Sequence, residues 1–308
     1  MRLLRPIAIA SLLLFAGVTP DAAKAAPLDV YFTTSDHVQL HYLAFGQASR
    51  PTVILVPGWL MPGDIFNYVA TELSNQYLVI AFDPRSHGRS DRPGFGHTPS
   101  RMAGDLRELM TDLKVSQAVM IGWSLGCAEI SAYIARYGGD SVLGYGCIDG
   151  FLTLPPEVPA AQNEFAFYYG LEENYRATVS AEIRDSFTRL PPALFDHLLE
   201  SAMKTPADTA EALNTNFLKV DGLGALATFG RPIIFYAAGT KNDQASALGA
   251  RIPAARIEYF PHARHALFSD DPDHFVAITR SFMARATTAA PPTAPAPGAS
   301  PAATGARR

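Results

Sequence analysis

The chain has little that would support a metal site or a surface for nucleic acid. It contains two cysteines in 308 residues, Cys127 and Cys147, and no His and Cys spacing typical of a metal site. Its formal net charge is −4, with 25 Lys and Arg against 29 Asp and Glu, which disfavours binding of nucleic acid by bulk electrostatics. We therefore expect no metal ion, no cofactor and no nucleic-acid partner.

The N-terminal apolar stretch, from Ile7 to Val18, is too short to cross a bilayer comfortably. Two arginines precede it, and Ala23-Lys24-Ala25 follows it as a small-x-small cleavage pattern. We predict that residues 1–25 are a signal peptide for export to a periplasm or the medium, and that the mature chain has no stable membrane span. An uncleaved N-terminal anchor is the alternative. Cleavage removes three basic residues and one acidic residue, so the formal charge changes from −4 to −6.

In an oxidising compartment the two cysteines could form a disulfide or remain buried thiols, and the sequence leaves both open. At the other end, residues 286–308 are a run of Ala, Pro, Thr and Gly without an aromatic residue. Such a segment cannot bury enough apolar surface to fold, so we predict a disordered tail. The sequence assigns no oligomeric state.

Between these ends, short apolar runs alternate with segments of helical periodicity. Thr52–Val56 and Tyr77–Phe82 are continuous apolar runs typical of strands buried on both faces, and Val38, Leu40 and Tyr42 alternate with polar residues as in an edge-type strand. Further strands are predicted at 118–121, 141–148, 232–238 and 256–260, with helices near 65–73, 100–110, 127–137 and 272–284. This alternation predicts an α/β fold with a mostly parallel sheet and helices on both faces.

Residues 151–230 interrupt the alternation, because they have helical character and no clear strand. We predict an inserted helical cap there, between a first core part at 28–150 and a second at 231–285. Five aromatic residues in or next to this segment are candidates for lining an apolar substrate pocket: Phe151, Phe165, Phe167, Tyr168 and Phe187.

The most informative motif is Gly122-Trp123-Ser124-Leu125-Gly126, which follows the apolar run at 118–121 and precedes a helical segment. A Gly-x-Ser-x-Gly sequence between strand and helix is typical of a sharp turn that exposes a nucleophilic serine, and the glycines remove Cβ atoms that would collide there. We therefore predict that Ser124 is a nucleophile.

A serine nucleophile needs a base, and histidine has a suitable pKa at neutral pH. His265 is the best candidate because it lies in a loop between a predicted strand and a predicted helix, with His262 as its rival. A carboxylate must then orient the imidazole, and two aspartates that follow strands compete for this role, Asp243 and Asp149.

Attack on a carbonyl also needs two backbone N–H groups for the oxygen that becomes negative. We predict that Leu125, directly after the nucleophile, supplies one. Trp59 supplies the other, from the loop after the first buried strand, where Gly58 permits close approach.

The chain resembles the α/β-hydrolase family in the order of five features: the Pro57-Gly58-Trp59 loop, the segment Asp83–Ser90, the serine turn, the turn from Gly239 to Asp243, and His265. The resemblance covers about residues 28–285 and is strongest to the small esterase and cofactor-free haloperoxidase-like branch. It implies an eight-stranded sheet of α/β-hydrolase type, needing no cofactor. Two positions depart from the family pattern: Pro57 replaces a common histidine, and Ser86 replaces a common glycine.

The resemblance also ranks the site residues. The family histidine commonly lies seven residues before a proline that opens the last helix, and this spacing to Pro272 selects His265. The acid commonly follows the strand at 232–238 in a Gly-x-x-Asp pattern, which favours Asp243 although the gap here has one extra residue. Some members carry the acid at the position of Asp149 instead.

A serine in the turn argues against the haloalkane dehalogenases and epoxide hydrolases of this fold, which use aspartate. We therefore expect a serine hydrolase that cleaves a small carboxylic ester or lactone of mainly apolar character. One alternative is a same-triad enzyme acting on C–C, cyanohydrin or peptide substrates. A peptidase would need cap carboxylates to hold a free amine, for which Glu164, Glu172 and Glu173 are candidates. The other alternative is a relative that binds a ligand without catalysis.

Overall fold

The computed structural model describes residues 26–152, 160–217 and 219–288, and the side chains of 160–169 lie outside that description. The predicted signal peptide at 1–25 and residues 289–308 of the predicted tail therefore lie outside the described residues. None of the helices in the described ranges is long and apolar enough to span a membrane.

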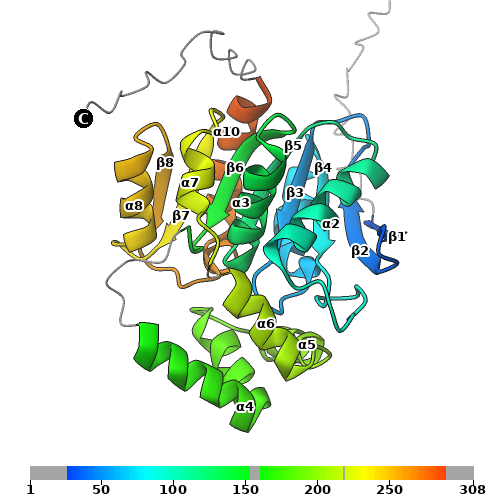
Figure 1. Cartoon of the computed structure of the whole chain (residues 1–308). Helices are drawn as coiled ribbons and strands as arrows, with labels where there is room; N and C mark the ends of the chain where they lie inside the picture. The colour runs from blue at the N-terminus through cyan, green and yellow to red at the C-terminus, as the bar shows by residue number, and fades with distance from the viewer. Residues whose placement is uncertain (1–25, 153–159, 218, 289–308) are drawn as a thin grey trace, which may run out of the picture.

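An eight-stranded sheet with the order β1-β2-β4-β3-β5-β6-β7-β8 forms the centre of the fold (Figure 1). The strands are β1 (Leu28–Thr33), β2 (Gln39–Phe45), β3 (Thr52–Val56), β4 (Leu78–Asp83), β5 (Ala118–Trp123), β6 (Val142–Ile148), β7 (Ile233–Ala238) and β8 (Arg256–Phe260). β2 is antiparallel to β1 and to β4, and every other neighbouring pair is parallel. The predicted mostly parallel eight-stranded sheet is confirmed.

The strand that the sequence predicted as an edge-type strand is not the edge of the sheet. β2, which contains the alternating Leu40 and Tyr42, is the second strand, and β1 pairs with it along Leu28–Thr33 to form the edge. β1 has one buried residue, Phe32, so its sequence lacks the apolar run that marks the central strands.

Central strands are apolar throughout because helices cover both faces of the sheet. Along β3, Val53 and Leu55 belong to one hydrophobic core, whereas Ile54 and Val56 belong to the other. Successive strand side chains point to opposite faces, so one five-residue run contributes to two cores.

The helices are η1 (Gly63–Phe66, a 3-10 helix), α1 (Asn67–Leu73), α2 (Pro99–Asp112), α3 (Leu125–Tyr137), α4 (Ala160–Asp185), α5 (Pro192–Ala202), α6 (Ala207–Phe217), α7 (Gly222–Ala227), α8 (Asp243–Arg251), α9 (Leu267–Asp270) and α10 (Pro272–Thr288). α1, α9 and α10 pack on one face of the sheet, and α2, α3, α7 and α8 pack on the other. α10 continues three residues past 285, the predicted end of the core.

Four helices and no strand occupy the described part of 151–230. Figure 1 shows α4, α5 and α6 together beyond one end of the sheet, whereas α7 lies beside α3. We use the name cap helices for α4, α5 and α6. The indole N–H of Trp59, in the loop after β3, donates to the carbonyl of Ala210 in α6 at 2.7 Å, so the cap helices lie over the carboxyl ends of the strands.

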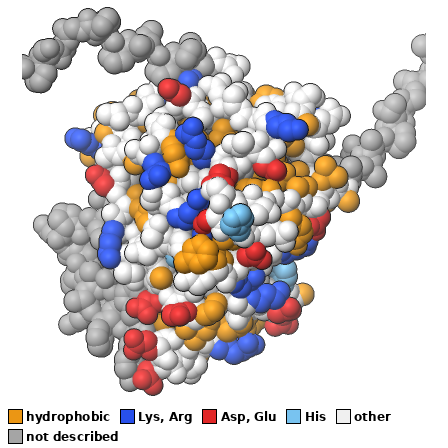
Figure 2. Space-filling view, turned by 45° about the vertical axis from the view of Figure 1, so that its right-hand side comes forward, with side chains coloured by type: hydrophobic (Ala, Val, Ile, Leu, Met, Phe, Trp, Pro, Cys, Tyr) orange, Lys and Arg blue, Asp and Glu red, His pale blue; other side chains and the backbone are white. Residues whose placement is uncertain are grey.

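Charges of both signs occur on the face that Figure 2 presents, with a group of acidic side chains at the lower left. This distribution agrees with the weak net charge of the sequence.

A disulfide joins Cys127 and Cys147, whose Cα atoms lie 5.2 Å apart. Cys127 is in the first turn of α3, and Cys147 is the last residue but one of β6. Both residues are fully buried. The bond therefore links the helix that follows Ser124 to the strand that precedes Asp149, which settles the choice that the sequence left open.

Replacing both cysteines by alanine should lower the free energy of unfolding by about 3 kcal/mol, because the bond closes a loop with a sequence separation of 20 residues. Denaturant unfolding of the two proteins measures this difference, and thiol titration of the unfolded oxidised protein should find no free thiol. Two titratable thiols per chain in protein made in an oxidising compartment would contradict the assignment.

Candidate active site

Ser124 lies in the turn between β5 and α3 with φ 53° and ψ −116°. Such a positive φ is rare for a residue with a side chain and costs on the order of 1–3 kcal/mol. The conformation is held by a hydrogen bond from the Ser124 N–H to the Ile148 carbonyl at 2.9 Å. The backbone strain predicted for a nucleophile turn is therefore present at this serine.

The two glycines of the turn are required by close backbone contacts. A Cβ atom on Gly122 would lie 2.3 Å from the carbonyl carbon of Gly126, and one on Gly126 would lie 2.4 Å from the carbonyl oxygen of Val56. Gly58 lies close to Ser124, since a Cβ atom added to Gly58 would lie 3.2 Å from the Cβ of Ser124. The loop after β3 is thus packed directly against the serine.

His265 lies in the loop between β8 and α9, and its Nδ1 is 2.8 Å from Oδ2 of Asp149. Asp149 directly follows β6, and its other carboxylate oxygen accepts hydrogen bonds from the Ala238 N–H at 3.1 Å and the Asn242 side chain at 2.8 Å. The carboxylate is therefore fixed by the end of β7. With Nδ1 held by Asp149, Nε2 is the ring nitrogen that remains for a proton from Ser124.

The preference for Asp243 as the partner of His265 is wrong in this geometry. Asn242 caps α8 by accepting from the Ala245 N–H at 3.0 Å, so Asp243 becomes the exposed first residue of that helix. A carboxylate there interacts favourably with the positive helix end. The extra residue between Gly239 and Asp243 was the sequence signal for this change, and the alternative candidate, Asp149, has the contact.

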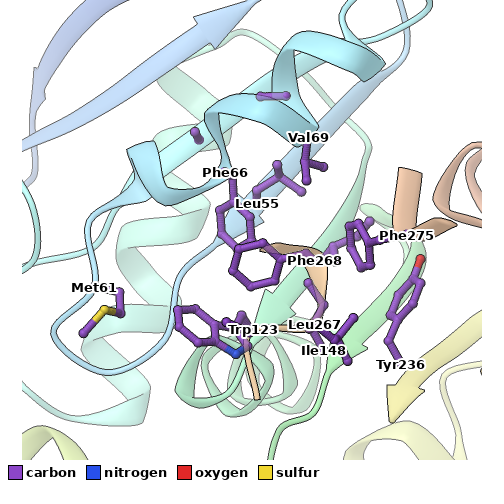
Figure 3. Close-up of a cluster of buried hydrophobic side chains, with 14 of the residues drawn as sticks. Leu55, Met61, Phe66, Val69, Trp123, Ile148, Tyr236, Leu267, Phe268 and Phe275 are labelled. Carbon is purple, nitrogen blue, oxygen red and sulfur yellow. The ribbon is translucent and has the colours of Figure 1, made fainter. Parts of the chain in front are cut away.

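Trp123, the residue before the serine, holds the histidine loop. Its indole N–H donates to the His265 carbonyl at 3.0 Å, and its ring centroid lies 5.4 Å from that of the imidazole and 5.1 Å from that of Phe268. Figure 3 shows Trp123 below Phe268 in the buried cluster that also contains Phe66 and Leu267. Packing of the core therefore positions the histidine relative to the serine.

The two candidate oxyanion donors lie on either side of Ser124. Leu125 is the first residue of α3, so its N–H is one of the four that have no acceptor within the helix. Trp59 follows Gly58 in the loop packed against Ser124. A developing negative charge there would also face the positive end of α3.

Ser124 and His265 line a common pocket of about 60 Å³ under the cap helices. In the described part of the chain no hydrogen bond joins their side chains, and such contacts often tighten only when substrate binds. The pocket is lined by Trp59, Met61, Trp123, Ser124, Glu182, Ser186 and His265.

The two aromatic residues predicted for the pocket whose side chains are described, Phe151 and Phe187, are not among its lining residues. Phe187 is buried in a hydrophobic core, and Phe151 is 51% exposed. The side chains of Phe165, Phe167 and Tyr168 lie outside the described residues. Core packing explains Phe187, which the sequence could not distinguish from a pocket residue.

Glu182, near the end of α4, is a lining residue that the sequence analysis missed. The residue is exposed as a whole, yet burial of its carboxyl group is the largest cause that raises its pKa; Asp185 raises it further and His265 lowers it. Whether Glu182 reaches the pocket depends on how α4 crosses the site, and helical periodicity in the sequence does not predict that crossing. Among the described residues, no group of three or more His, Cys, Asp or Glu side chains could hold a metal ion.

Asp149→Asn should lower kcat for the reaction at this site by about 10³-fold, because the amide cannot stabilise the imidazolium or select the correct tautomer. Asp243→Asn, the matched control, should change kcat by less than about twofold, since an exposed residue at a helix start affects only stability. Steady-state kinetics of both variants measures the difference. A large loss in the Asp243 variant alone would restore the other assignment.

A model of the Alpha/beta hydrolase family matches residues 53–278 of the chain. Among curated relatives, a non-heme chloroperoxidase of Streptomyces lividans is 39% identical over 105 residues, which cover 34% of this chain and 38% of that protein. A bifunctional esterase/perhydrolase of Acinetobacter calcoaceticus is 34% identical over 113 residues, which cover 36% and 41%. These matches therefore span less than half of each relative.

Solved structures match over a larger part of the chain. An esterase from Exiguobacterium antarcticum has a TM-score of 0.76 at 18% identity, covering 83% of this chain and all of that one. An enol-lactonase from Burkholderia xenovorans has a TM-score of 0.73 at 19% identity, again covering 83% and 100%. At these identities the likeness shows the fold.

Proposed function

The chain belongs to the α/β-hydrolase family, and we propose that it is a serine hydrolase that cleaves a small carboxylic ester or lactone through an acyl-enzyme. One observation carries the proposal. The Asp149–His265 pair and the strained Ser124 face one pocket. A partly buried base–carboxylate pair beside a serine held in such a turn is the arrangement that nucleophilic catalysis at neutral pH needs.

In the proposed reaction, Ser124 Oγ attacks the ester carbonyl while His265 Nε2 takes its proton. The resulting oxyanion is stabilised by the backbone N–H groups of Trp59 and Leu125. His265 then gives the proton to the departing alcohol, and the carbonyl re-forms as an acyl-serine. A water molecule deprotonated by the same histidine attacks the acyl group and releases the acid, which restores Ser124.

The pocket supports a short acyl chain. Its volume of about 60 Å³ is small beside the cavities that hold drug-sized ligands, and Trp59, Met61 and Trp123 form mainly apolar walls. A relative named as a bifunctional esterase/perhydrolase and a structural neighbour named as an enol-lactonase support hydrolysis of an ester or lactone as the basic reaction. We propose small-molecule esters as substrates, and export through cleavage after Ala25.

A series of p-nitrophenyl esters of increasing acyl length tests the proposal. We expect hydrolysis by the mature protein with an optimum at the shortest chains, because longer acyl groups exceed the pocket. Ser124→Ala should lower kcat by at least about 10³-fold, since it removes the nucleophile and leaves only the oxyanion donors. Release of nitrophenol, followed by absorbance, gives both values.

Equal activity of wild type and the Ser124→Ala variant would contradict the proposal. Ser131→Ala is a suitable control, because this serine lies in the same helix but its hydroxyl hydrogen-bonds to the Cys127 carbonyl at 2.9 Å, away from the pocket. Its activity should stay close to that of wild type.

A further inference from the structure

Glu182 brings the only carboxylate into the described lining of the pocket. The other lining residues are Trp59, Met61 and Trp123, the proposed reacting residues Ser124 and His265, and Ser186. In the described part of the chain its carboxylate has no hydrogen-bond or ion-pair partner. No Lys or Arg is among the described residues that line the pocket. Arg184, two residues after Glu182, and Arg264, next to His265, have other partners. Arg184 lies over the ring of Phe195 at 3.7 Å, and Arg264 is 3.7 Å from the carboxylate of Asp185.

The position of Glu182 relative to the reacting residues is fixed by the end of α4. The Ala266 N–H, next to His265, donates to the Ser186 carbonyl at 2.7 Å, and the Ser186 hydroxyl donates to the Glu182 carbonyl at 2.8 Å. The Arg264 side chain also donates to the Asp185 carbonyl at 3.3 Å. The helix turn that carries Glu182 is thus bonded to the loop that carries His265.

A negative charge beside aromatic rings is the environment that recognises an ammonium group. The carboxylate supplies charge and accepts N–H hydrogen bonds, and the faces of Trp side chains attract cations. Trp59, Trp123 and Ser124 line the same pocket as Glu182, in a volume of about 60 Å³. A cation held there would therefore be close to the scissile carbonyl.

We propose that Glu182 selects esters that carry an ammonium group near the scissile carbonyl. This inference rests on the proposed function, and it replaces the expectation of a mainly apolar substrate. It also replaces the cap carboxylates suggested by the sequence. Glu172 and Glu173 are exposed on α4 and do not line the pocket, and Glu164 lies outside the residues with described side chains.

Two ester pairs test the proposal at about pH 7, where an α-amino group is mostly protonated. L-alanine methyl ester and methyl isobutyrate differ in an ammonium against a methyl group on the acyl side. Acetylcholine and 3,3-dimethylbutyl acetate differ in the same way on the alcohol side. The ratio of kcat/KM within each pair, compared between enzyme variants, cancels the intrinsic reactivity of each ester.

In Glu182→Gln we expect the ratio of cationic to neutral ester to fall by about tenfold in at least one pair, because a partly buried charge contact is lost while the shape is kept. The pair that responds shows on which side of the ester bond the cation lies. Glu172→Gln is the matched control, since it removes the same charge from the same helix outside the pocket, and its ratios should change by less than about twofold.

Unchanged ratios in Glu182→Gln would overturn the inference, and so would an equal loss for all four esters, which would show a general structural role. The Ser124→Ala variant separates these results from the proposed function. If it loses all four activities while the Glu182 ratios stay constant, the hydrolase assignment holds and the selectivity does not. If it keeps them, the hydrolase assignment itself fails.

Discussion

The backbone conformation of Ser124 is the constraint on which the rest of the site depends. A positive φ at a residue with a side chain persists only where its surroundings enforce it, and here they do so through the hydrogen bond from the Ser124 N–H to the Ile148 carbonyl and through close packing around the turn. The glycine at 126 packs against the carbonyl of Val56, and the glycine at 122 packs against the start of α3. These contacts bring the ends of β3 and β5 together at the serine. The loop after β3 and the first N–H of α3 are consequently close to the same point.

The base and its carboxylate reach that point from other elements. Asp149 is held between the ends of β6 and β7 by hydrogen bonds to its second oxygen, so its charge is oriented before any substrate arrives. The Cys127–Cys147 bond runs from α3 to β6 beside it. Trp123 connects the serine turn to the histidine loop through one hydrogen bond and two ring contacts. Preorganisation of this kind reduces the rearrangement needed in the transition state.

The cap helices add side chains to the pocket that the sheet and its loops do not supply. Their contact with the core is polar as well as apolar: the end of α4 is bonded to the histidine loop, and α6 accepts the indole N–H of Trp59. This arrangement brings a carboxylate into the same pocket as two tryptophans. In the proposed function the core supplies the reacting residues, and in the proposed selectivity the cap helices supply the residue that chooses the substrate.

The sequence predicted the sheet and the serine turn because both depend on local patterns. Apolar runs of five or six residues mark strands covered on both faces, and the two glycines around Ser124 mark a turn that no larger residue allows. The partner of His265 was harder to predict, because it depends on the exact length of the turn after β7. One extra residue in that turn makes Asp243 the first residue of α8. The pocket residues Glu182 and Phe187 depended on how cap helices pack, and helical periodicity shows which face is buried but not against what.

Labelling with a fluorophosphonate, followed by peptide mass spectrometry, shows whether Ser124 is an activated nucleophile, because this reagent bonds covalently to a serine only where the residue is activated. We expect one adduct per chain, on the peptide that contains Ser124, with labelling that slows by orders of magnitude when His265 is replaced by alanine. An adduct on another residue, or no adduct on folded protein, would show that Ser124 is not the nucleophile.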